Sequence, residues 1–206
     1  MSRSEPPALL SADDLDAIVE RLAGGAVVAV PTDTVFGLAA LLTPQSVARV
    51  FAAKGRPADL ALPVLIGGWG QVGRVASSVP NAAATLAARF WPGPLTLVVP
   101  ARRRIGALVG GSGRSVGIRW PDHPLIEELC LSLGPLAVTS ANRHGEPPCT
   151  SAAQVRARFV ANEVAAVVEG RAAGVPSTVV DCTGRRPGCL REGATGWAEI
   201  EAALSD

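Results

Sequence analysis

Residues 26–57, AVVAVPTDTVFGLAALLTPQSVARVFAAKGRP, decide the fold. Two apolar runs in this stretch, residues 26–30 and 35–41, flank a polar turn and predict two buried strands. A threonine and a proline then begin a helix over residues 44–54, and Gly55 ends it. Strand, turn, strand and helix in this order indicate a protein of the α/β or α+β class.

The chain continues to alternate between strands and helices on both sides of this stretch. Before it, apolar residues recur at helical spacing over residues 11–25, where Ser11 and Asp14 resemble a capping box. After it, the pattern predicts strands near residues 62–66, 95–99, 116–120, 136–139, 165–168, 178–181 and 189–191, and helices near 81–91, 125–133, 152–159 and 197–204. Because the spacing is not that of regular βαβ units, we expect a mixed sheet covered by helices.

Length and composition favour one domain. The chain has 206 residues, 48% of them hydrophobic, which is enough for one substantial core and short for two. It contains no internal repeat and no linker rich in Pro, Gly or Ser, so residues 1–206 are predicted to fold as a single domain. The glycine-rich residues 110–113 are interpreted as a loop within that domain.

Charge, cysteine content and hydropathy exclude several classes of protein. The formal net charge of +1 gives no overall field that would attract nucleic acid or an acidic membrane. The four cysteines form no CxxC pair and the two histidines form no HExxH pattern, so we expect no protein-built metal site. No apolar run approaches the ~20 residues of a membrane span, and the N-terminus lacks an apolar signal segment. We therefore expect a cytoplasmic protein with reduced thiols.

Lys54 and Arg56 are the first candidates for a binding site. Lys54 is the only lysine among 19 basic residues, which indicates a position where a guanidinium cannot replace the compact ammonium. The two cations bracket Gly55, and such a pair suits a polyphosphate. The alternative is that they only complement the dipole at the end of the helix.

Familiar signatures of nucleotide binding and hydrolysis are absent, but polar residues follow several predicted strands. The sequence contains no GxxxxGK[ST], no GxGxxG and no GxSxG. Ligands of open α/β sheets bind at the ends of strands. The polar residues in such places include Thr32, Arg119, Ser140, Asn142, Ser177 and Arg191.

Each of these residues also has a purely structural interpretation. Arg119 at a strand end suits a substrate carboxylate, or it forms a surface salt bridge. Ser140 and Asn142 suit phosphate, ribose or base, or they form an ordinary turn after a strand. The basic run at residues 102–104 is predicted to be a solvated loop without a catalytic role.

Taken together, these segments resemble the YrdC/Sua5 family. The resemblance covers about residues 25–191 and rests on VPTDTVFGL, KGRP, WPGPLTLVVP, VGIRWPDHP, PLAVTSAN, PSTVVDCTG and CLREG, in this order. It implies a twisted mixed sheet flanked by helices around a positively charged concave cleft. It also implies a nucleotidyltransferase that forms L-threonylcarbamoyladenylate and pyrophosphate from L-threonine, bicarbonate and ATP. In the family this product feeds a separate transferase complex, which makes N6-threonylcarbamoyladenosine in tRNA.

The resemblance also implies roles for individual residues. Lys54 and Arg56 would be the catalytic residues and would hold the phosphates of ATP. Further ATP contacts would come from Ser115, Ser140, Asn142 and Arg191, and the threonine side would be lined by Thr32, Arg119 and Ser177. Mg²⁺ would arrive with the triphosphate. Neither a metal site of the protein nor a tightly bound organic cofactor is expected.

The chain departs from the family pattern at two places. Many relatives carry Asn-Pro where this chain has Leu60 and Ala61, and some carry a histidine at the position of Leu65. Contacts to the nucleotide and to threonine are therefore expected to differ at these positions. The chain looks like the short single-domain form of the family, without the C-terminal domain of longer relatives.

Two other functions stay open. One is a carbamoyl-adenylate-forming module similar to that of hydrogenase maturation factors, which uses carbamoyl phosphate; the acylphosphatase and zinc-finger segments found there are missing from this sequence. The other is a binding module whose cationic cleft grips double-stranded RNA or tRNA through shape and phosphate contacts. The near-neutral net charge predicts weak RNA binding at most.

Overall fold

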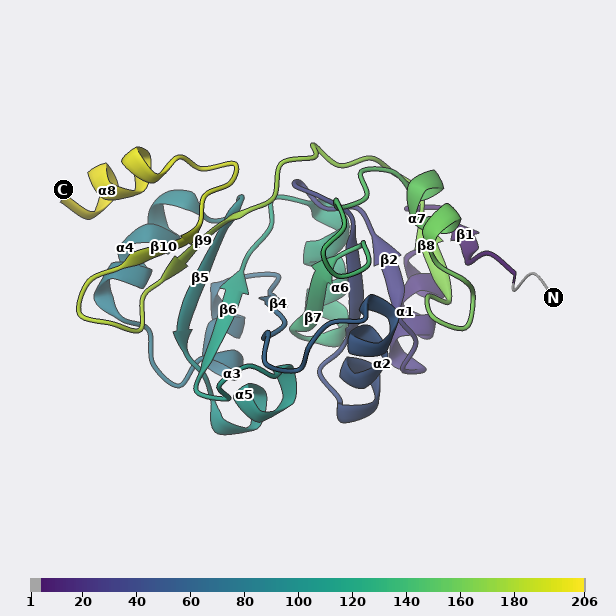
Figure 1. The fold of residues 1–206 in the computed structure, drawn as a ribbon, viewed down its shortest axis with the longest axis horizontal. Helices are drawn as coiled ribbons and strands as arrows, with labels where there is room; N and C mark the ends of the chain where they lie inside the picture. The colour runs from purple at the N-terminus through teal and green to yellow at the C-terminus, as the bar shows by residue number, and fades with distance from the viewer. Residues whose placement is uncertain (1–4, 206) are drawn as a thin grey trace.

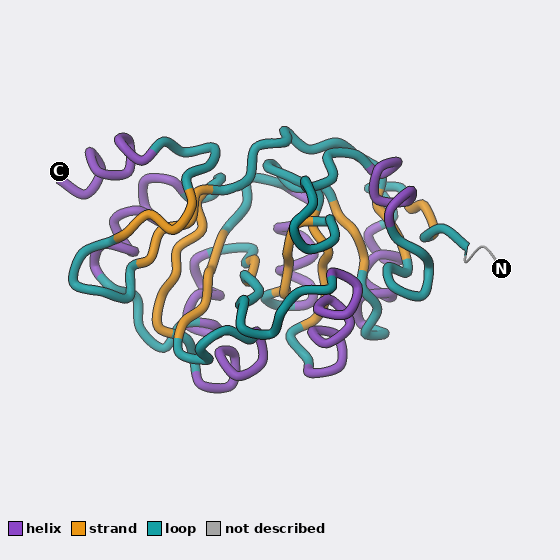
Figure 2. The backbone as a smooth tube through the Cα atoms, in the orientation of Figure 1, coloured by secondary structure: helices purple, strands orange, loops and turns teal. Residues whose placement is uncertain are grey.

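The computed structural model describes residues 5–205, and over this part of the chain the strands form one mixed ten-stranded sheet with helices packed around it (Figures 1 and 2). The strands are β1 (Ala8–Leu10), β2 (Val28–Val30), β3 (Gly37–Leu41), β4 (Val64–Leu65), β5 (Leu95–Pro100), β6 (Ser115–Arg119), β7 (Leu136–Ser140), β8 (Ala166–Val168), β9 (Thr178–Asp181) and β10 (Gly188–Arg191). The helices are α1 (Leu15–Ala23), α2 (Pro44–Lys54), α3 (Val72–Val75), α4 (Asn81–Phe90), α5 (Arg103–Val109), α6 (Pro124–Leu133), α7 (Ala152–Arg158) and α8 (Trp197–Ser205), with a 3₁₀ turn η1 (Trp69–Gln71).

The order of the strands brings distant parts of the sequence together. The sheet runs β1-β8-β2-β3-β7-β4-β6-β5-β9-β10, with parallel and antiparallel neighbours mixed as expected. Antiparallel pairing of β3 with β7 sets Gly37 opposite Ser140, and parallel pairing of β4 with β6 sets Leu65 opposite Arg119. The polar turn before β3 and the polar ends of β6 and β7 therefore lie at neighbouring places in the sheet.

Apolar side chains pack on both faces of the sheet. On one face, Ile18 of α1 and Ile126 of α6 pack with strand residues such as Val28 in one buried cluster. On the other, Val50 of α2 and Leu86 of α4 belong to a larger cluster that continues across β5 and β6. Figure 1 shows α4 and α8 together at one end of the sheet and α7 at the other. Burial of these apolar side chains is the main source of stability for such an arrangement.

The helix α2 has the ends that the sequence predicts. Thr43 accepts a hydrogen bond from the backbone N–H of Ser46 (3.3 Å), and Pro44 occupies the first helical position. Gly55 adopts the left-handed conformation (φ 61°), which is costly for a residue with a Cβ atom. Its N–H bonds to the carbonyl of Ala52, so the chain turns sharply just after Lys54.

Several boundaries differ from the prediction. The first helix begins at Leu15 rather than at Ser11, because Asp14 is the residue that caps it, through the N–H of Ala17. The basic run at residues 102–104 is exposed as predicted, but it is not a loop: Arg103 begins α5, and the Nε of Arg102 donates to the carbonyl of Gly73. The predicted strand at 62–66 is reduced to the two residues of β4. The strand β1 was not predicted, and neither were η1, α3 and α5.

Other expectations agree with the structure. Gly110 ends α5, and residues 110–113 form a loop. All four cysteines are free: Cys130, Cys149 and Cys182 are buried and Cys189 is exposed. Over residues 5–205, no helix combines the length and the hydropathy that a membrane span requires.

Candidate active site

A cavity of about 460 Å³ lies against the sheet. Successive side chains of a strand point to opposite faces. Accordingly, the lining residues of β5 are Thr96 and Val98, that of β9 is Val179, and those of β6 are Ser115, Gly117 and Arg119 together with Val116, which departs from the alternation. The intervening residues Leu97 and Ile118 are buried in the core on the other side. Strand periodicity thus places most of the cavity lining and the buried core on opposite faces of the same segments.

Three arginines from different parts of the chain meet at this cavity. Within the described residues, its basic lining side chains are those of Arg56, Arg119 and Arg191, and its acidic one is that of Asp59. Arg56 follows α2, Arg119 ends β6 and Arg191 ends β10. Three of the four predicted cationic residues therefore converge, although they lie up to 135 positions apart in the sequence, and the fourth, Lys54, is not in the lining.

Hydrogen bonds to backbone carbonyls hold the three guanidinium groups in place. Arg56 donates to the carbonyls of Leu60 and Ala61, both at 2.9 Å. Arg191 donates to the carbonyl of Ser177 through Nε (3.1 Å) and through a terminal nitrogen (2.7 Å). Each group keeps further N–H bonds free of these partners, because a guanidinium has five donors.

Arg119 is the most buried of the three, with 5% of its surface exposed. Its Nε donates to the carbonyl of Gly93 (2.9 Å), one terminal nitrogen donates to Thr34 Oγ1 (2.8 Å), and the other forms an ion pair with Asp33. Such a fixed fork suits recognition of a planar carboxylate. The alternative of a surface salt bridge is therefore wrong in part: Arg119 does form a salt bridge, with Asp33, but the pair is buried at the cavity wall.

The surroundings of the three arginines lower the pKa of each guanidinium group. Burial lowers the pKa of all three guanidinium groups, and the charge of Arg191 lowers the pKa of Arg56 and Arg119 further. Asp33 opposes this shift at Arg119. Asp59 likewise opposes it at Arg56, so each of these two guanidinium groups has a carboxylate beside it. Guanidinium groups stay protonated at neutral pH even so.

Lys54 lies behind the cavity wall rather than on it. The residue is 2% exposed and is not among the lining residues. Its Nζ donates to the carbonyl (2.7 Å) and hydroxyl (3.3 Å) of Ser140, and to the side-chain (2.7 Å) and backbone (3.1 Å) oxygens of Asn142. Burial, and then the charge of Arg56, lower the pKa of Lys54 to about 8.

We call these three residues, Lys54, Ser140 and Asn142, the Lys54 cluster. Ser140 lines the cavity, whereas Asn142 is buried with Lys54 behind it. The Ser-Ala-Asn segment is thus more than an ordinary turn, because it supplies every hydrogen-bond acceptor found for the lysine in the described chain. Direct contact of Lys54 and Asn142 with ATP stays a prediction.

Thr32 and Ser177 both lie at the cavity and both have their hydroxyls engaged. Thr32 Oγ1 donates to the carbonyl of Val35 (2.7 Å) and lies 3.0 Å from Thr34 Oγ1. Ser177 Oγ and Thr96 Oγ1 are 2.9 Å apart. Of the nine predicted site residues, the lining ones are Thr32, Arg56, Ser115, Arg119, Ser140, Ser177 and Arg191.

Some residues of the site were not singled out from the sequence. Thr34, Asp59 and Thr96 line the cavity, and Asp33 pairs with Arg119. Strand alternation could have indicated Thr96, because it is the polar residue in the apolar run of β5. The positions that depart from the family pattern, Leu60, Ala61 and Leu65, also line the cavity.

No cluster of His, Cys, Asp or Glu able to hold a metal ion occurs in residues 5–205. The cavity offers the single carboxylate of Asp59 within that range. Mg²⁺ is commonly bound through one or two carboxylates together with substrate phosphates. The carboxylate of Asp59 would fit a Mg²⁺ ion that is carried by a nucleotide.

Comparison with known proteins identifies relatives along most of the chain. The Sua5/YciO/YrdC family profile, described as telomere recombination, matches residues 20–193. Threonylcarbamoyl-AMP synthase of Pyrococcus abyssi is 40% identical over 186 residues, which cover 88% of this chain and 54% of the relative. A putative threonylcarbamoyl-AMP synthase of Mycobacterium tuberculosis H37Rv is 37% identical over 190 residues, covering 90% of this chain and 87% of the relative.

Solved structures resemble the same region. The crystal structure of P. abyssi Sua5 complexed with L-threonine superposes with a TM-score of 0.86 at 36% identity, over 96% of this chain and 60% of that one. Escherichia coli YciO gives a TM-score of 0.82 at 22% identity, which supports the fold alone. This chain thus spans little more than half the length of its Pyrococcus relative. On the extent of the profile match and the identity to these relatives, the chain belongs to the Sua5/YciO/YrdC family.

Proposed function

We propose that this chain is a nucleotidyltransferase that forms L-threonylcarbamoyladenylate and pyrophosphate from L-threonine, bicarbonate and ATP. The observation that carries the proposal is the convergence of Arg56, Arg119 and Arg191 on one cavity. The names of the relatives from Pyrococcus and Mycobacterium, and the L-threonine complex of Pyrococcus Sua5, support the same reaction. A carbamate and a triphosphate brought together carry a concentrated negative charge, which these cations would offset.

The proposed reaction needs positioning more than a protein nucleophile. The amine of L-threonine combines with bicarbonate, losing water, to give a carbamate. A carbamate oxygen then attacks the α-phosphorus of ATP, an O–P bond forms, and the bond to the β,γ-pyrophosphate breaks. The protein would hold the two anions in line and neutralise them. Mg²⁺ bound to the triphosphate would neutralise part of its charge.

Residue roles in this proposal follow the two groups of contacts around the cavity. Arg119, with Thr32 and Ser177 nearby in the lining, would hold L-threonine, and its buried fork would take the carboxylate. The nucleotide would contact Arg56, Ser115, Ser140 and Arg191, and since Arg191 is hydrogen-bonded to Ser177, it would lie where the two substrates meet. The ammonium of Lys54 would act on the phosphates from behind Ser140 or after a small rotation of its side chain.

We also propose where the product goes. L-threonylcarbamoyladenylate would pass, in the cytoplasm, to a transferase complex that modifies tRNA, and direct RNA binding by this chain would be weak. The low net charge of +1 supports weak binding, because nucleic-acid affinity rests on several phosphate contacts. A titration of tRNA at increasing salt would test this. Tight, steeply salt-dependent binding without ATP turnover would favour an RNA-binding module instead.

An omission assay tests the proposed reaction. Pyrophosphate release from ATP is measured with both L-threonine and bicarbonate, and with either one left out. The proposal expects release only in the complete mixture. Equal release without threonine would refute the proposal, and release supported by carbamoyl phosphate in place of threonine and bicarbonate would point to the carbamoyl-adenylate reaction.

A further inference from the structure

The end of α2, which carries Lys54, is held by the residues that follow Asn142. The last carbonyl groups of an α-helix lack partners within the helix. Here the carbonyl of Ala53 accepts a hydrogen bond from Arg143, and the carbonyl of Lys54 accepts one from the backbone N–H of His144 (2.8 Å). The loop after β7 therefore caps the helix end on which Lys54 stands, and a positive charge at that end also suits the helix dipole.

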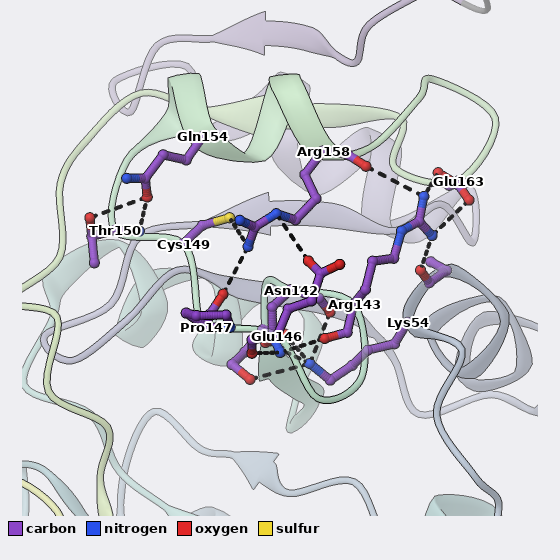
Figure 3. A network of polar contacts seen from close by, with 12 residues as sticks. Lys54, Asn142, Arg143, Glu146, Pro147, Cys149, Thr150, Gln154, Arg158 and Glu163 are labelled. Carbon is purple, nitrogen blue, oxygen red and sulfur yellow. Dashed lines mark hydrogen bonds and ion pairs between the residues drawn. The ribbon is translucent and has the colours of Figure 1, made fainter.

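Arg143 is itself fixed from the other side by Glu163. The two terminal nitrogens of Arg143 each donate to one carboxylate oxygen of Glu163 at 2.8 Å, which is a bidentate pair. The guanidinium carbon also lies 4.7 Å from the centre of the Phe159 ring. Figure 3 shows Glu163, Arg143 and the end of α2 in one continuous network that reaches Lys54. Arg143 donates to the carbonyl of Arg158 as well (3.4 Å), so its guanidinium is held by four different groups at once.

The same loop orients Asn142. The amide nitrogen of Asn142 donates to the carbonyls of Arg143 (2.8 Å) and Glu146 (2.7 Å). This leaves the amide oxygen turned toward Lys54 Nζ, at 2.7 Å. A movement of the loop at residue 143 would therefore displace Asn142. Through the ammonium of Lys54, it would also displace Ser140 on the cavity wall.

We infer that Arg143, held by Glu163, is a positioning residue that keeps the Lys54 cluster in the arrangement that binds ATP. The inference rests on the proposed function and adds to it a residue that touches no substrate, since Arg143 does not line the cavity. The ion pair is bidentate and partly buried, so its loss should cost some stability as well as ATP affinity. The KM values for ATP and for L-threonine separate these two effects.

The effect should be confined to the ATP side. The hydrogen-bond partners of Arg119 are Asp33, Thr34 and Gly93, and none of them belongs to the Lys54 cluster. Loss of Arg143 should therefore leave the threonine subsite intact. If the substitution instead destabilised the whole protein, the binding of both substrates would be weakened.

The test is a comparison of KM values in the Arg143→Ala variant. Initial rates of pyrophosphate release are measured against ATP at saturating L-threonine, and against L-threonine at saturating ATP. We expect the KM for ATP to rise about tenfold, the effect of losing one charge-assisted hydrogen bond, with the KM for L-threonine unchanged. Arg143→Lys keeps the charge and one bond to a carbonyl, so it should recover part of the ATP affinity. Glu163→Ala should also raise the KM for ATP, by a smaller factor than Arg143→Ala.

Arg156→Ala is the matched control. Arg156 belongs to α7, and its Nε bonds to a backbone carbonyl, that of Pro7 (3.0 Å), away from the Lys54 cluster. This variant should keep both wild-type KM values. An unchanged KM for ATP in Arg143→Ala, an equal rise for L-threonine, or the same rise in Arg156→Ala would overturn the inference.

Two measurements keep this test separate from the proposed function and from folding. Calorimetric titration of the wild type and of each variant with ATP alone gives the affinity for ATP even if no product forms. If the wild type binds ATP without turnover, the proposed function is refuted, but the ATP affinities of the variants still test the role of Arg143. If Arg143→Ala does not fold, Arg143→Lys and Glu163→Ala carry the comparison. Wild-type ATP affinity in both would overturn the inference.

Discussion

Among single residues, the proposed site depends most on a buried lysine, Lys54. Lys54 gives its hydrogen bonds to Ser140 and Asn142, so its ammonium organises the polar residues at the cavity wall. Lys54→Ala should lower the rate of pyrophosphate release by on the order of 100-fold, because both the charge and the donors are lost. Circular dichroism should show an intact fold. Wild-type rates in this variant would remove Lys54 from the mechanism.

The lowered pKa of Lys54 predicts a pH dependence of ATP binding. Burial disfavours the charged ammonium and brings its pKa to about 8, so the group is mainly positive below pH 8 and loses its charge above it. ATP affinity, measured by calorimetry without threonine, should therefore fall as the pH rises through about 8. The Lys54→Met variant is the control, and its weaker affinity should lack this step. An identical step in that variant would assign the titration to another group.

The sequence indicated which residues of the site matter better than how they are arranged. Lys54 stands out as the only lysine of the chain, and the polar residues at strand ends were identified as a group. The position of Lys54 behind the wall, and the pair formed by Arg143 and Glu163, depend on contacts across 86 and 20 sequence positions. Spacing along one sequence carries no information about such directions and contacts.

At the scale of elements, the segment after β10 keeps Arg191 and Ser177 together. A Cβ atom built on Gly193 would lie 2.2 Å from the carbonyl oxygen of Pro176 and 2.7 Å from that of Ser177, which are backbone atoms that cannot swing away. Gly193→Ala should therefore cost about 1–3 kcal/mol of stability, the usual range for overpacking, and should weaken ATP binding. Chemical denaturation and an ATP titration measure the two effects.

Gly188, the first residue of β10, provides the control for this prediction. A Cβ atom there meets no heavy atom within 4 Å. Gly188→Ala should therefore leave the free energy of unfolding and the ATP affinity near their wild-type values. Equal free energies of unfolding and equal ATP affinities in the two variants would show that the close approach at Gly193 affects neither stability nor ATP binding.

Elements with a local signal were predicted and those without one were not. The helix α2 has a capping threonine, a proline at its start and a terminal glycine, and its predicted bounds are those observed. By contrast, the residue before α5, Arg102, makes no capping bond through its side chain, so the basic run resembles a loop. The short strand β1 is held by parallel pairing with β8, more than 150 positions away, and has little pattern of its own.

At the scale of the whole molecule, the sheet order creates the site. The mixed sheet was expected from the alternating elements, but the neighbours of each strand could not be read from periodicity. The pairing of β3 with β7 and of β4 with β6 brings together residues about 50 to 100 positions apart. The convergence of the arginines was anticipated through the resemblance to the YrdC/Sua5 family, because relatives preserve a three-dimensional arrangement that a single sequence does not display.

In the proposed reaction, the cavity lined by Arg56, Arg119 and Arg191 joins an amino-acid carbamate to the adenylyl group of ATP. The most direct measurement incubates the protein with ATP, L-threonine and ¹³C-labelled bicarbonate and identifies the nucleotide products by mass spectrometry. We expect threonylcarbamoyl-AMP that carries the label, formed in the same amount as pyrophosphate. Hydrolysis of ATP to ADP, or AMP formation without a labelled adduct, would contradict it.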